Sequence, residues 1–291
     1  MFGIIFNPAS GGGKSAVLAD QIGAIISRRN GTYRMFQTKC VGDGGNQARK
    51  ALEAGCDAVV CIGGDGTLSE VVQSVARSGI PLYIVPAGTG NDFARMLKLP
   101  KDPIKAFCLQ LDGEPKKIDC GSINGKAFLN VSGSGFDVEV LRKTEELKSM
   151  YSGGKAYSKA VLAVLGSYQA FEADVSIDDG AFEKKQCTII EVANGRYIGG
   201  GMSVAPHACF DDGLFDVVVV DRVPRRAIPF LLPLFKLGLH VYLPVAQVIR
   251  AKNVIIRGKG MTANIDGRLE SMDEARFSML PGALTVMMPR K

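Results

Sequence analysis

One stretch constrains this chain more than any other: an apolar run that stops at a glycine-rich turn holding one carboxylate. The run is Val59–Ile62, and the turn is Gly63-Gly64-Asp65-Gly66-Thr67. Apolar residues then recur at helical spacing, which predicts strand, loop and helix in that order. The first backbone N–H groups of such a helix are unpaired, and with the helix dipole they attract phosphate. The turn therefore indicates a phosphate site; for any single turn of this kind, a tight turn with a capping Asp is the alternative.

Two further turns of the same kind follow apolar runs. Residues 7–15 follow the run 2–6, and residues 86–92 follow the run 81–85. Neither the P-loop pattern nor the dinucleotide-binding fingerprint fits, because the first glycine of a P-loop would fall on Pro8. In an open parallel sheet, loops at the carboxyl ends of the strands converge on one crevice. A single polyphosphate ligand would explain all three turns.

The alternation of strands and helices predicts the fold class of the first part. Residues 1–120 read as an α/β domain, with a parallel sheet between two layers of helices. From about Asp119 the pattern changes to mostly antiparallel strands, which predicts a second, β-rich domain over residues 121–281. Its expected strands are 126–132, 173–179, 186–194, 214–220, 252–258, 261–266 and 275–280, with helices near 138–150 and 155–170. The last apolar run, Leu284–Met288, could return to either domain, so residues 282–291 are a candidate return to the first.

Composition places the chain in a general class and localises its charge. With 291 residues and 46% hydrophobic content, it is an ordinary globular protein. The first residues lack a basic leader, and the seven cysteines form no Cys-x-x-Cys pair, so we expect reduced thiols in a cytoplasm. The net charge of +6 is local: residues 221–260 carry eight Lys or Arg and one acid, while the rest of the chain is close to neutral. Such a local field suggests an anionic partner surface.

Five blocks of residues, in order along the chain, resemble those of a known family. They are Asn7-Pro8 with Ser10-Gly11, Gly63–Thr67, Gly88–Phe93, Gly199–Met202, and Asp212-Gly213. Together they closely resemble the soluble bacterial diacylglycerol kinase or lipid kinase family, whose relatives include sphingosine kinases. The Gly-Gly-Asp-Gly turn alone also occurs in NAD kinases. The resemblance implies a nucleotide-binding α/β domain, a β-sandwich-like lipid domain, ATP as phosphoryl donor and a lipid hydroxyl as acceptor.

The resemblance also implies site residues. Nucleotide contacts fall on Asn7, Ser10, Gly11, Gly12, Gly13, Lys14, Thr38, Gly63, Gly64, Asp65, Gly66, Thr67, Thr89 and Asn91. Asp65, Asp92 and Asp119 match a carboxylate network that acts through water on a catalytic Mg²⁺, which prefers hard oxygen ligands. A solvated turn is the alternative role for Asp119.

This chain departs from the family pattern where the family usually has its general base. The family's catalytic strand ends in Asp-Gly-Glu, but here Asp266-Gly267 is followed by Arg268. A guanidinium cannot accept a proton. Either Asp266 or Glu270 takes the catalytic role, or positioning and metal suffice, or the enzyme is impaired. If a missing base limits the enzyme, Arg268→Glu should raise its activity.

A second departure concerns a structural Mg²⁺ site that the resemblance implies. Asp212 and the backbone carbonyl of Leu214 match two of its ligands. Cys209 stands where the first Asp is expected, and a thiol is a poor magnesium ligand. The site therefore requires Asp211 as a substitute.

The preferred interpretation is an ATP- and Mg²⁺-dependent lipid kinase at the cytoplasmic face of the membrane, with no nucleic-acid partner. One alternative is a catalytically weak nucleotide- or lipid-binding protein, because of Arg268; another is a soluble kinase resembling NAD kinase. No side-chain pattern identifies the lipid.

The most apolar stretch predicts a membrane contact of a limited kind. Residues 227–235 include two prolines and are far shorter than the roughly 20 needed to cross a bilayer. Flanking cations predict that this stretch docks on anionic membranes; they are Arg222, Arg225, Arg226 and Lys236. A buried helix of the second domain is the alternative.

Overall fold

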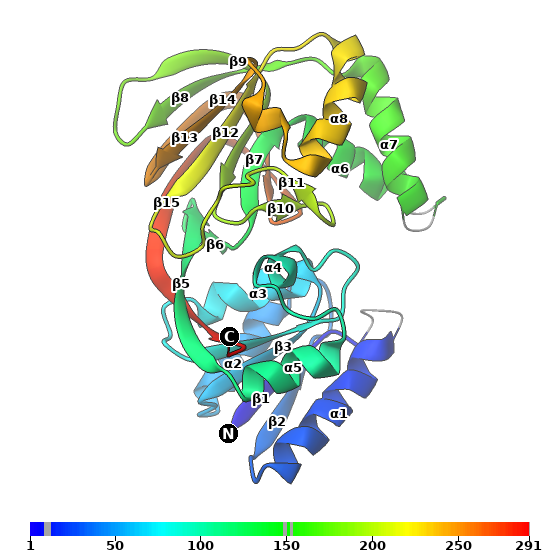
Figure 1. The fold of residues 1–291 in the computed structure, drawn as a ribbon, viewed down its shortest axis with the longest axis vertical. Helices are drawn as coiled ribbons and strands as arrows, with labels where there is room; N and C mark the ends of the chain where they lie inside the picture. Colours follow the sequence, from blue (N-terminus) through cyan, green and yellow to red (C-terminus); the bar gives the residue numbers. More distant parts are fainter. Residues whose placement is uncertain (9–12, 148–149, 152–153, 291) are drawn as a thin grey trace.

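The computed structural model describes residues 1–8, 13–147, 150–151 and 154–290. The chain forms two lobes joined by long strands (Figure 1). The N-terminal lobe contains β1 (Phe2–Phe6), α1 (Lys14–Arg28), β2 (Tyr33–Gln37), α2 (Gly44–Glu53), β3 (Ala58–Gly63), α3 (Asp65–Val75), β4 (Pro81–Pro86), α4 (Asp92–Met96) and α5 (Pro103–Leu111).

The N-terminal lobe is a three-layer α/β structure. Its sheet has the order β4-β3-β1-β2, and all three neighbouring pairs are parallel. Strand β3 is buried along its whole length, as expected for a strand covered on both faces. Helices α1 and α5 pack on one face around Ile22 and Phe107, while α2, α3 and α4 pack on the other around Val72 and Phe93. The predicted α/β fold of this lobe is confirmed.

The C-terminal lobe is built from antiparallel strands and three helices. Its elements are β5 (Glu114–Ile123), β6 (Lys126–Phe128), β7 (Val131–Gly135), α6 (Phe136–Leu147), α7 (Gly154–Ser167), β8 (Phe171–Ile177), β9 (Glu183–Ala193), β10 (Tyr197–Ile198), β11 (Met202–Ser203), β12 (Phe215–Asp221), α8 (Ile228–Leu237), β13 (Ala246–Ala251), β14 (Asn253–Ile265) and β15 (Arg268–Met288). Strands β9 and β14 each pair with both β7 and β8, so the strands fold over one another around a buried core. The β-sandwich-like class expected for this lobe is confirmed.

Two strand predictions differ from the structure for identifiable reasons. Residues 126–132 were expected to form one strand, but β6 and β7 are separate because the backbone N–H groups of Leu129, Asn130 and Val131 donate to the Asp266 carboxylate. Residues 252–258 and 261–266 were expected to form two strands, but they are one strand, β14. A register shift between Arg257 and Met261 interrupts its pairing with β15.

Two long strands connect the lobes. Strands β5 and β15 pair antiparallel from Ile123 and Phe277 in the C-terminal lobe to Glu114 and Met288 beside the N-terminal sheet, with an irregularity between Leu280 and Leu284. Near its end, β15 also pairs in parallel with β4. The last strand therefore belongs to both lobes, as Figure 1 shows, and any motion of one lobe against the other must bend this pair.

We expect Phe128→Ala to destabilise the C-terminal lobe strongly. The Phe128 ring is fully buried, stacks on Phe215 with ring centroids 5.8 Å apart, and meets Phe277 edge-on at 6.1 Å. Truncating such a ring costs about 3–5 kcal/mol. Calorimetry should show a clearly lower unfolding temperature, whereas Phe230→Ala, at a side chain that is 78% exposed, should change it little. Equal unfolding temperatures for the two variants would contradict this view of the core.

Candidate active site

Glycine-rich turns from both lobes meet at the carboxyl edge of the N-terminal sheet. The turns after β3 and β4 are in backbone contact: a Cβ atom on Gly88 would lie 2.4 Å from the Gly64 Cα. A side chain at either position would push the two turns apart. Gly90 in turn lies beside Gly200 of the C-terminal lobe. Glycine is required at these positions because three backbone segments pass close to one another.

Asn91 shapes the turn after β4. It adopts a left-handed conformation with φ of 51°, and its side-chain amide both accepts from the Gly88 N–H at 3.0 Å and donates to the Gly88 carbonyl at 2.8 Å. Thr89, at the tip of this turn, is exposed. The structure thus gives Asn91 a role in holding the turn, and leaves Thr89 accessible to a ligand.

Two carboxylates lie at the starts of neighbouring helices. Asp65 is the first residue of α3 and accepts from the Phe93 N–H at 3.2 Å; Asp92 is the first residue of α4 and accepts from the Gly200 N–H at 2.8 Å. Burial raises the pKa of the Asp65 carboxyl, although backbone donors oppose the rise. Burial also raises the pKa of Asp92, and the Asp65 charge adds to that rise. The pair is therefore a partly desolvated concentration of negative charge that a cation would relieve.

The Asp65 and Asp92 side chains fit a catalytic Mg²⁺ ion. The Oδ1 atom of Asp92 is buried and has no hydrogen-bond donor among the described residues, and Arg95 Nε lies 3.8 Å from it. Across the part of the chain that the structure describes, no three His, Cys, Asp or Glu side chains gather closely enough to hold a metal alone. Magnesium is commonly held by one or two carboxylates together with phosphate oxygens and water. The donors present suit a metal bound jointly with a nucleotide.

The remaining predicted nucleotide contacts lie along the same edge of the sheet. Ser10, Gly11 and Gly12 fall outside the described residues, while Gly13 and the exposed Lys14 begin α1. Thr38 directly follows β2, and its buried Oγ1 has no hydrogen-bond partner. A buried hydroxyl without a partner costs free energy, so it points to a ligand group at this position. Thr67 is buried against Gly63, which leaves no room for a side chain there.

Asp266 and Glu270, the candidate bases, already have partners. Asp266 accepts from the N–H groups of Leu129 at 2.7 Å, Asn130 at 2.9 Å and Val131 at 3.3 Å. Burial raises its pKa to about 6 in spite of these donors. Glu270 forms an ion pair with Lys126 on β6. Asp266 thus holds the connection between β6 and β7, and its catalytic role stays a prediction, as does that of Glu270.

Asp119, on β5, links the two strands that connect the lobes to a loop of the C-terminal lobe. Its two carboxylate oxygens accept from the Gly213 N–H at 2.7 Å and the Gly282 N–H at 2.8 Å, and the residue is only 4% exposed. These bonds link β5, the irregular part of β15 and the loop before β12. A contribution of Asp119 to the metal at Asp65 and Asp92 stays a prediction.

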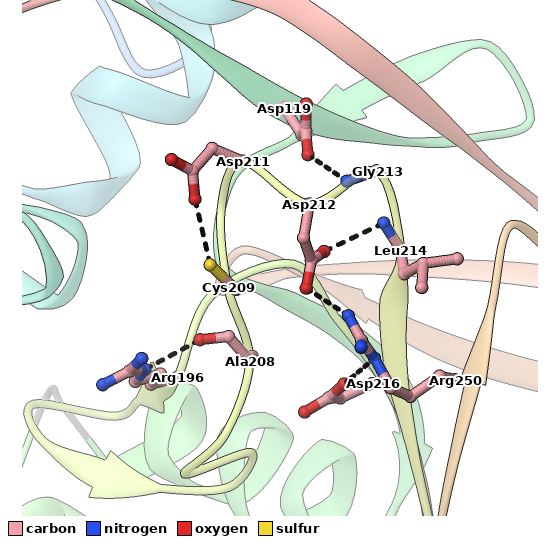
Figure 2. A network of polar contacts seen from close by, with 10 residues as sticks. All are labelled: Asp119, Arg196, Ala208, Cys209, Asp211, Asp212, Gly213, Leu214, Asp216 and Arg250. Carbon is pink, nitrogen blue, oxygen red and sulfur yellow. Dashed lines mark hydrogen bonds and ion pairs between the residues drawn. The ribbon is translucent and has the colours of Figure 1, made fainter.

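The loop before β12 does not fit the structural Mg²⁺ site expected at Asp212 and Leu214. Figure 2 shows that Arg250 of β13 reaches this loop: its guanidinium pairs with Asp212, and its Nε lies 3.6 Å from Asp216 Oδ1. The other oxygen of Asp212 accepts from the Leu214 N–H at 3.1 Å. A guanidinium of the chain itself therefore neutralises the carboxylates.

The proposed substitute ligand, Asp211, is also engaged. Cys209 Sγ donates to its Oδ1 at 2.9 Å (Figure 2), and Lys116 forms an ion pair with its Oδ2. The Cys209 hydrogen bond and the Lys116 charge lower the pKa of Asp211. With both carboxylates paired and a thiol at the third position, the expectation of a structural Mg²⁺ at this loop is not supported.

Sequence reasoning missed two partners of the candidate site residues, one within the C-terminal lobe and one across the lobes. Arg250 was counted only as part of a basic segment, and the backbone N–H of Gly200 carries no side-chain signal. The run Gly199-Gly200-Gly201 was nevertheless a usable signal, since all three residues have positive φ, of 60°, 86° and 112°. Such a run indicates a backbone turn built to approach another group closely.

Family models match the two lobes separately. The diacylglycerol kinase catalytic domain matches residues 1–123, and the YegS C-terminal NAD kinase beta sandwich-like domain matches residues 130–288. A two-lobed kinase architecture is the class that these matches define.

Full-length relatives agree with the family models. A diacylglycerol kinase of Mycobacterium tuberculosis is 34% identical over 294 residues, covering 98% of this chain and 94% of the relative. A protein of Pseudomonas aeruginosa named "Probable lipid kinase YegS-like" is 35% identical, covering 93% of this chain and 90% of that protein. A crystal structure of a diacylglycerol kinase from Bacillus anthracis has the same fold, with a TM-score of 0.73 at 22% identity over 99% of this chain and 96% of that one. The chain belongs to the family of diacylglycerol kinases and YegS-like lipid kinases.

We expect Arg250, and not a metal ion, to stabilise the loop before β12. Arg250→Gln should lower the unfolding temperature by about 2–6 °C, equivalent to about 1–2 kcal/mol, because Asp212 and Asp216 lose their cation. Lys143→Gln, which removes an exposed pair with Glu146, is the control and should have little effect. The Mg²⁺ test uses an Asp65→Asn protein, so that the first site does not contribute. A rise in its unfolding temperature with Mg²⁺ while Arg250 is intact would show a metal at this loop after all.

Proposed function

We propose that this protein is an ATP- and Mg²⁺-dependent lipid kinase, which transfers the γ-phosphoryl group to a hydroxyl of diacylglycerol or a related lipid. The observation that carries the proposal is a pair of carboxylates at the meeting point of the glycine-rich turns, half-buried Asp65 and buried Asp92. Asp92 also accepts from Gly200 of the other lobe. Nucleotide and acceptor sites on different lobes would then share one set of charged groups.

The proposed roles of the residues follow from their positions. The backbone N–H groups of the turns after β1, β3 and β4 would bind phosphate oxygens, and Lys14 would add a cation at the start of α1. Asp65 and Asp92 would hold Mg²⁺, which when bound offsets the charge on the transferred phosphoryl group. Closure of the two lobes would exclude water, which would otherwise compete with the lipid hydroxyl.

The acceptor proton needs a base that is ionised near neutral pH. The pKa of Asp266 is raised to about 6, which is still below 7, so its carboxylate is charged at pH 7. Because this pKa is higher than that of an ordinary Asp, the Asp266 carboxylate is also a stronger base. Its carboxylate accepts three backbone hydrogen bonds and has capacity for about one more. We therefore assign Asp266 as the candidate base ahead of Glu270, whose charge is paired with Lys126.

Whole-length similarity favours a lipid acceptor over NAD. Relatives named diacylglycerol kinase and lipid kinase match more than nine-tenths of the chain at about one-third identity. The β-sandwich-like lobe on its own is shared with NAD kinases, so it does not discriminate. The acceptor assay below separates the two.

We expect Asp65→Asn to abolish phosphoryl transfer, with a loss of about 100-fold or more, because the variant cannot supply the metal's charged ligand. The protein is incubated with labelled ATP, Mg²⁺ and a panel of diacylglycerol, phosphatidylglycerol, sphingosine, ceramide, undecaprenol and NAD. Asp20→Asn, at an exposed position on α1, is the matched control. A folded Asp65→Asn protein that turns over at the parent rate would remove Asp65 from the mechanism. If the parent binds ATP but labels no acceptor, a binding protein is the better description.

A surface at the end of the C-terminal lobe supports peripheral membrane contact. No helix in the described part of the chain is long and apolar enough to cross a membrane. Helix α8 is anchored by buried Ile228 and Phe235, and the Phe235 ring stacks on His240 at 3.6 Å. Its other side exposes Phe230 at 78% and Leu237 at 68%, and Tyr242 nearby is 68% exposed. The stretch is thus partly a core helix and partly an exposed apolar surface, and the exposed part supports the proposed membrane contact.

Cations surround this surface, so we expect binding to anionic vesicles that weakens with salt. Each cation near anionic lipid contributes about 1 kcal/mol. The charge variant replaces Arg222, Arg226 and Lys236 by Gln, and keeps Arg225 because its Nη1 donates to the Gly166 carbonyl at 2.9 Å. Co-sedimentation with phosphatidylglycerol vesicles should fall for this variant and for Phe230→Ser, but not for Val17→Ser, which lies on α1 and is 58% exposed. Binding that ignores salt and lipid charge would return α8 to a purely structural role.

A further inference from the structure

An ion pair joins the lobes beside the candidate active site. Arg268, the first residue of β15, places its Nη2 atom 3.2 Å from the Oε1 atom of Glu70 on α3. Glu70 lies five residues after Asp65 on the same helix, and Arg268 lies two residues after Asp266. The pair therefore connects α3, which begins with Asp65, to the turn that carries Asp266.

Glu70 is held firmly on its own lobe. Its carboxylate accepts from the Gly42 N–H and the Gly44 N–H, both at 2.8 Å, and its side chain is only 9% exposed. Gly44 has no space for a side chain, because a Cβ atom there would lie 2.7 Å from the Glu70 Cβ. A carboxylate fixed and desolvated in this way gains more from a cation than an exposed one does. Arg268 supplies that cation from the opposite lobe.

The turn that precedes Arg268 is also held by hydrogen bonds. Asp266 binds three backbone N–H groups between β6 and β7, and the Gly267 N–H donates to Asn264 Oδ1 at 2.8 Å. The Nη2 atom of Arg268 is buried and has no hydrogen-bond partner apart from its ion pair with Glu70. Backbone hydrogen bonds therefore hold the turn from which Arg268 extends toward Glu70.

A second contact from the same helix supports the same docking. The Gln73 side-chain amide donates to the Ala127 carbonyl at 2.6 Å and accepts from the Ala127 N–H at 3.0 Å. Glu70 and Gln73 are three residues apart, so they share one face of α3. Both residues of that face bind the C-terminal lobe, one through charge and one through backbone hydrogen bonds.

We propose that Arg268 is a positioning residue that ties the two lobes together through Glu70 and thereby fixes the Asp266 turn relative to Asp65. The catalytic consequence of this inference rests on the proposed function, whereas the tie between the lobes does not. The family pattern has a Glu at position 268. In this chain an Arg stands there instead, and it supplies a cation to the buried carboxylate of Glu70. A Glu at this position would face Glu70 and repel it, so Arg268→Glu should lower activity, the opposite of what a missing base would predict.

The test compares three variants at position 268 with a matched control on the same strand. Arg268→Met removes the charge and keeps a long side chain; Arg268→Lys keeps the charge; Arg268→Glu reverses it. The control is Arg276→Met, because Arg276 pairs with Glu274 on its own strand and does not bridge the lobes.

Hydrogen exchange measures the tie without any assay of activity. The N–H groups of Gly42 and Gly44 donate to Glu70, and those of Leu129 to Val131 donate to Asp266. We expect faster exchange at both sets in Arg268→Met and Arg268→Glu, little change in Arg268→Lys, and none in Arg276→Met. Unchanged exchange at both sets in Arg268→Met would overturn the tie, whether or not the protein is a lipid kinase.

Kinetics then test the positioning role. With the lipid acceptor identified in the labelling assay, Arg268→Met should lower kcat by about ten- to a hundredfold with little change in the KM for ATP. Arg268→Lys should recover most of the loss, and Arg268→Glu should be the least active. An Arg268→Glu enzyme as active as the parent, or more active, would overturn the proposal and support the missing base. Absence of kinase activity in the parent would refute the proposed function, while the exchange result would still decide the tie.

Discussion

The active-site arrangement depends on one steric constraint: the turns after β3 and β4 touch through their backbones at Gly64 and Gly88. Only at that separation can Asp65 accept from the N–H of Phe93, and only then do α3 and α4 begin side by side. The same closeness brings Asp92 to the N–H of Gly200 in the other lobe. Two carboxylates are thereby held together by backbone groups of three separate turns, before any ligand contributes.

The carboxylates of this structure, buried and exposed, differ in how their charge is compensated. Glu70, Asp211, Asp212 and Asp216 receive a Lys or Arg from elsewhere in the chain. Glu191 lies deep in the C-terminal lobe beside Asp137, and neither of its oxygens has a hydrogen-bond partner among the described residues; burial raises its pKa well above the ordinary value. Asp65 and Asp92 belong to neither group: each accepts from a backbone N–H, and a guanidinium near the pair, that of Arg95, lies 3.8 Å from Asp92 Oδ1. That contrast, more than the presence of acidic residues, distinguishes a place for a metal from a structural ion pair.

Much of the fold was predictable because its signals are local. Strand β3 is a short, wholly apolar run followed by a glycine turn and a helical period, and each of these features is set by neighbouring residues. The break between β6 and β7 was not predictable, because it depends on Asp266, some 135 residues further along the chain. The continuity of β14 was hidden by Gly258 and Gly260, which look like a turn but form an irregularity within one strand.

The sequence by itself determined the class of the protein: three glycine turns after apolar strands, followed by a β-rich half, define the architecture and predict a phosphate site at one edge of the sheet. Tertiary structure alone decided what the charged side chains do. Arg250 and Arg268 look alike in the sequence, as basic residues near acidic motifs. One cancels the charge at a loop where a metal was expected, and the other reaches Glu70 across the lobes. The reason is physical: the energy of an ionic side chain depends on distance and burial, which are set by residues far away along the chain.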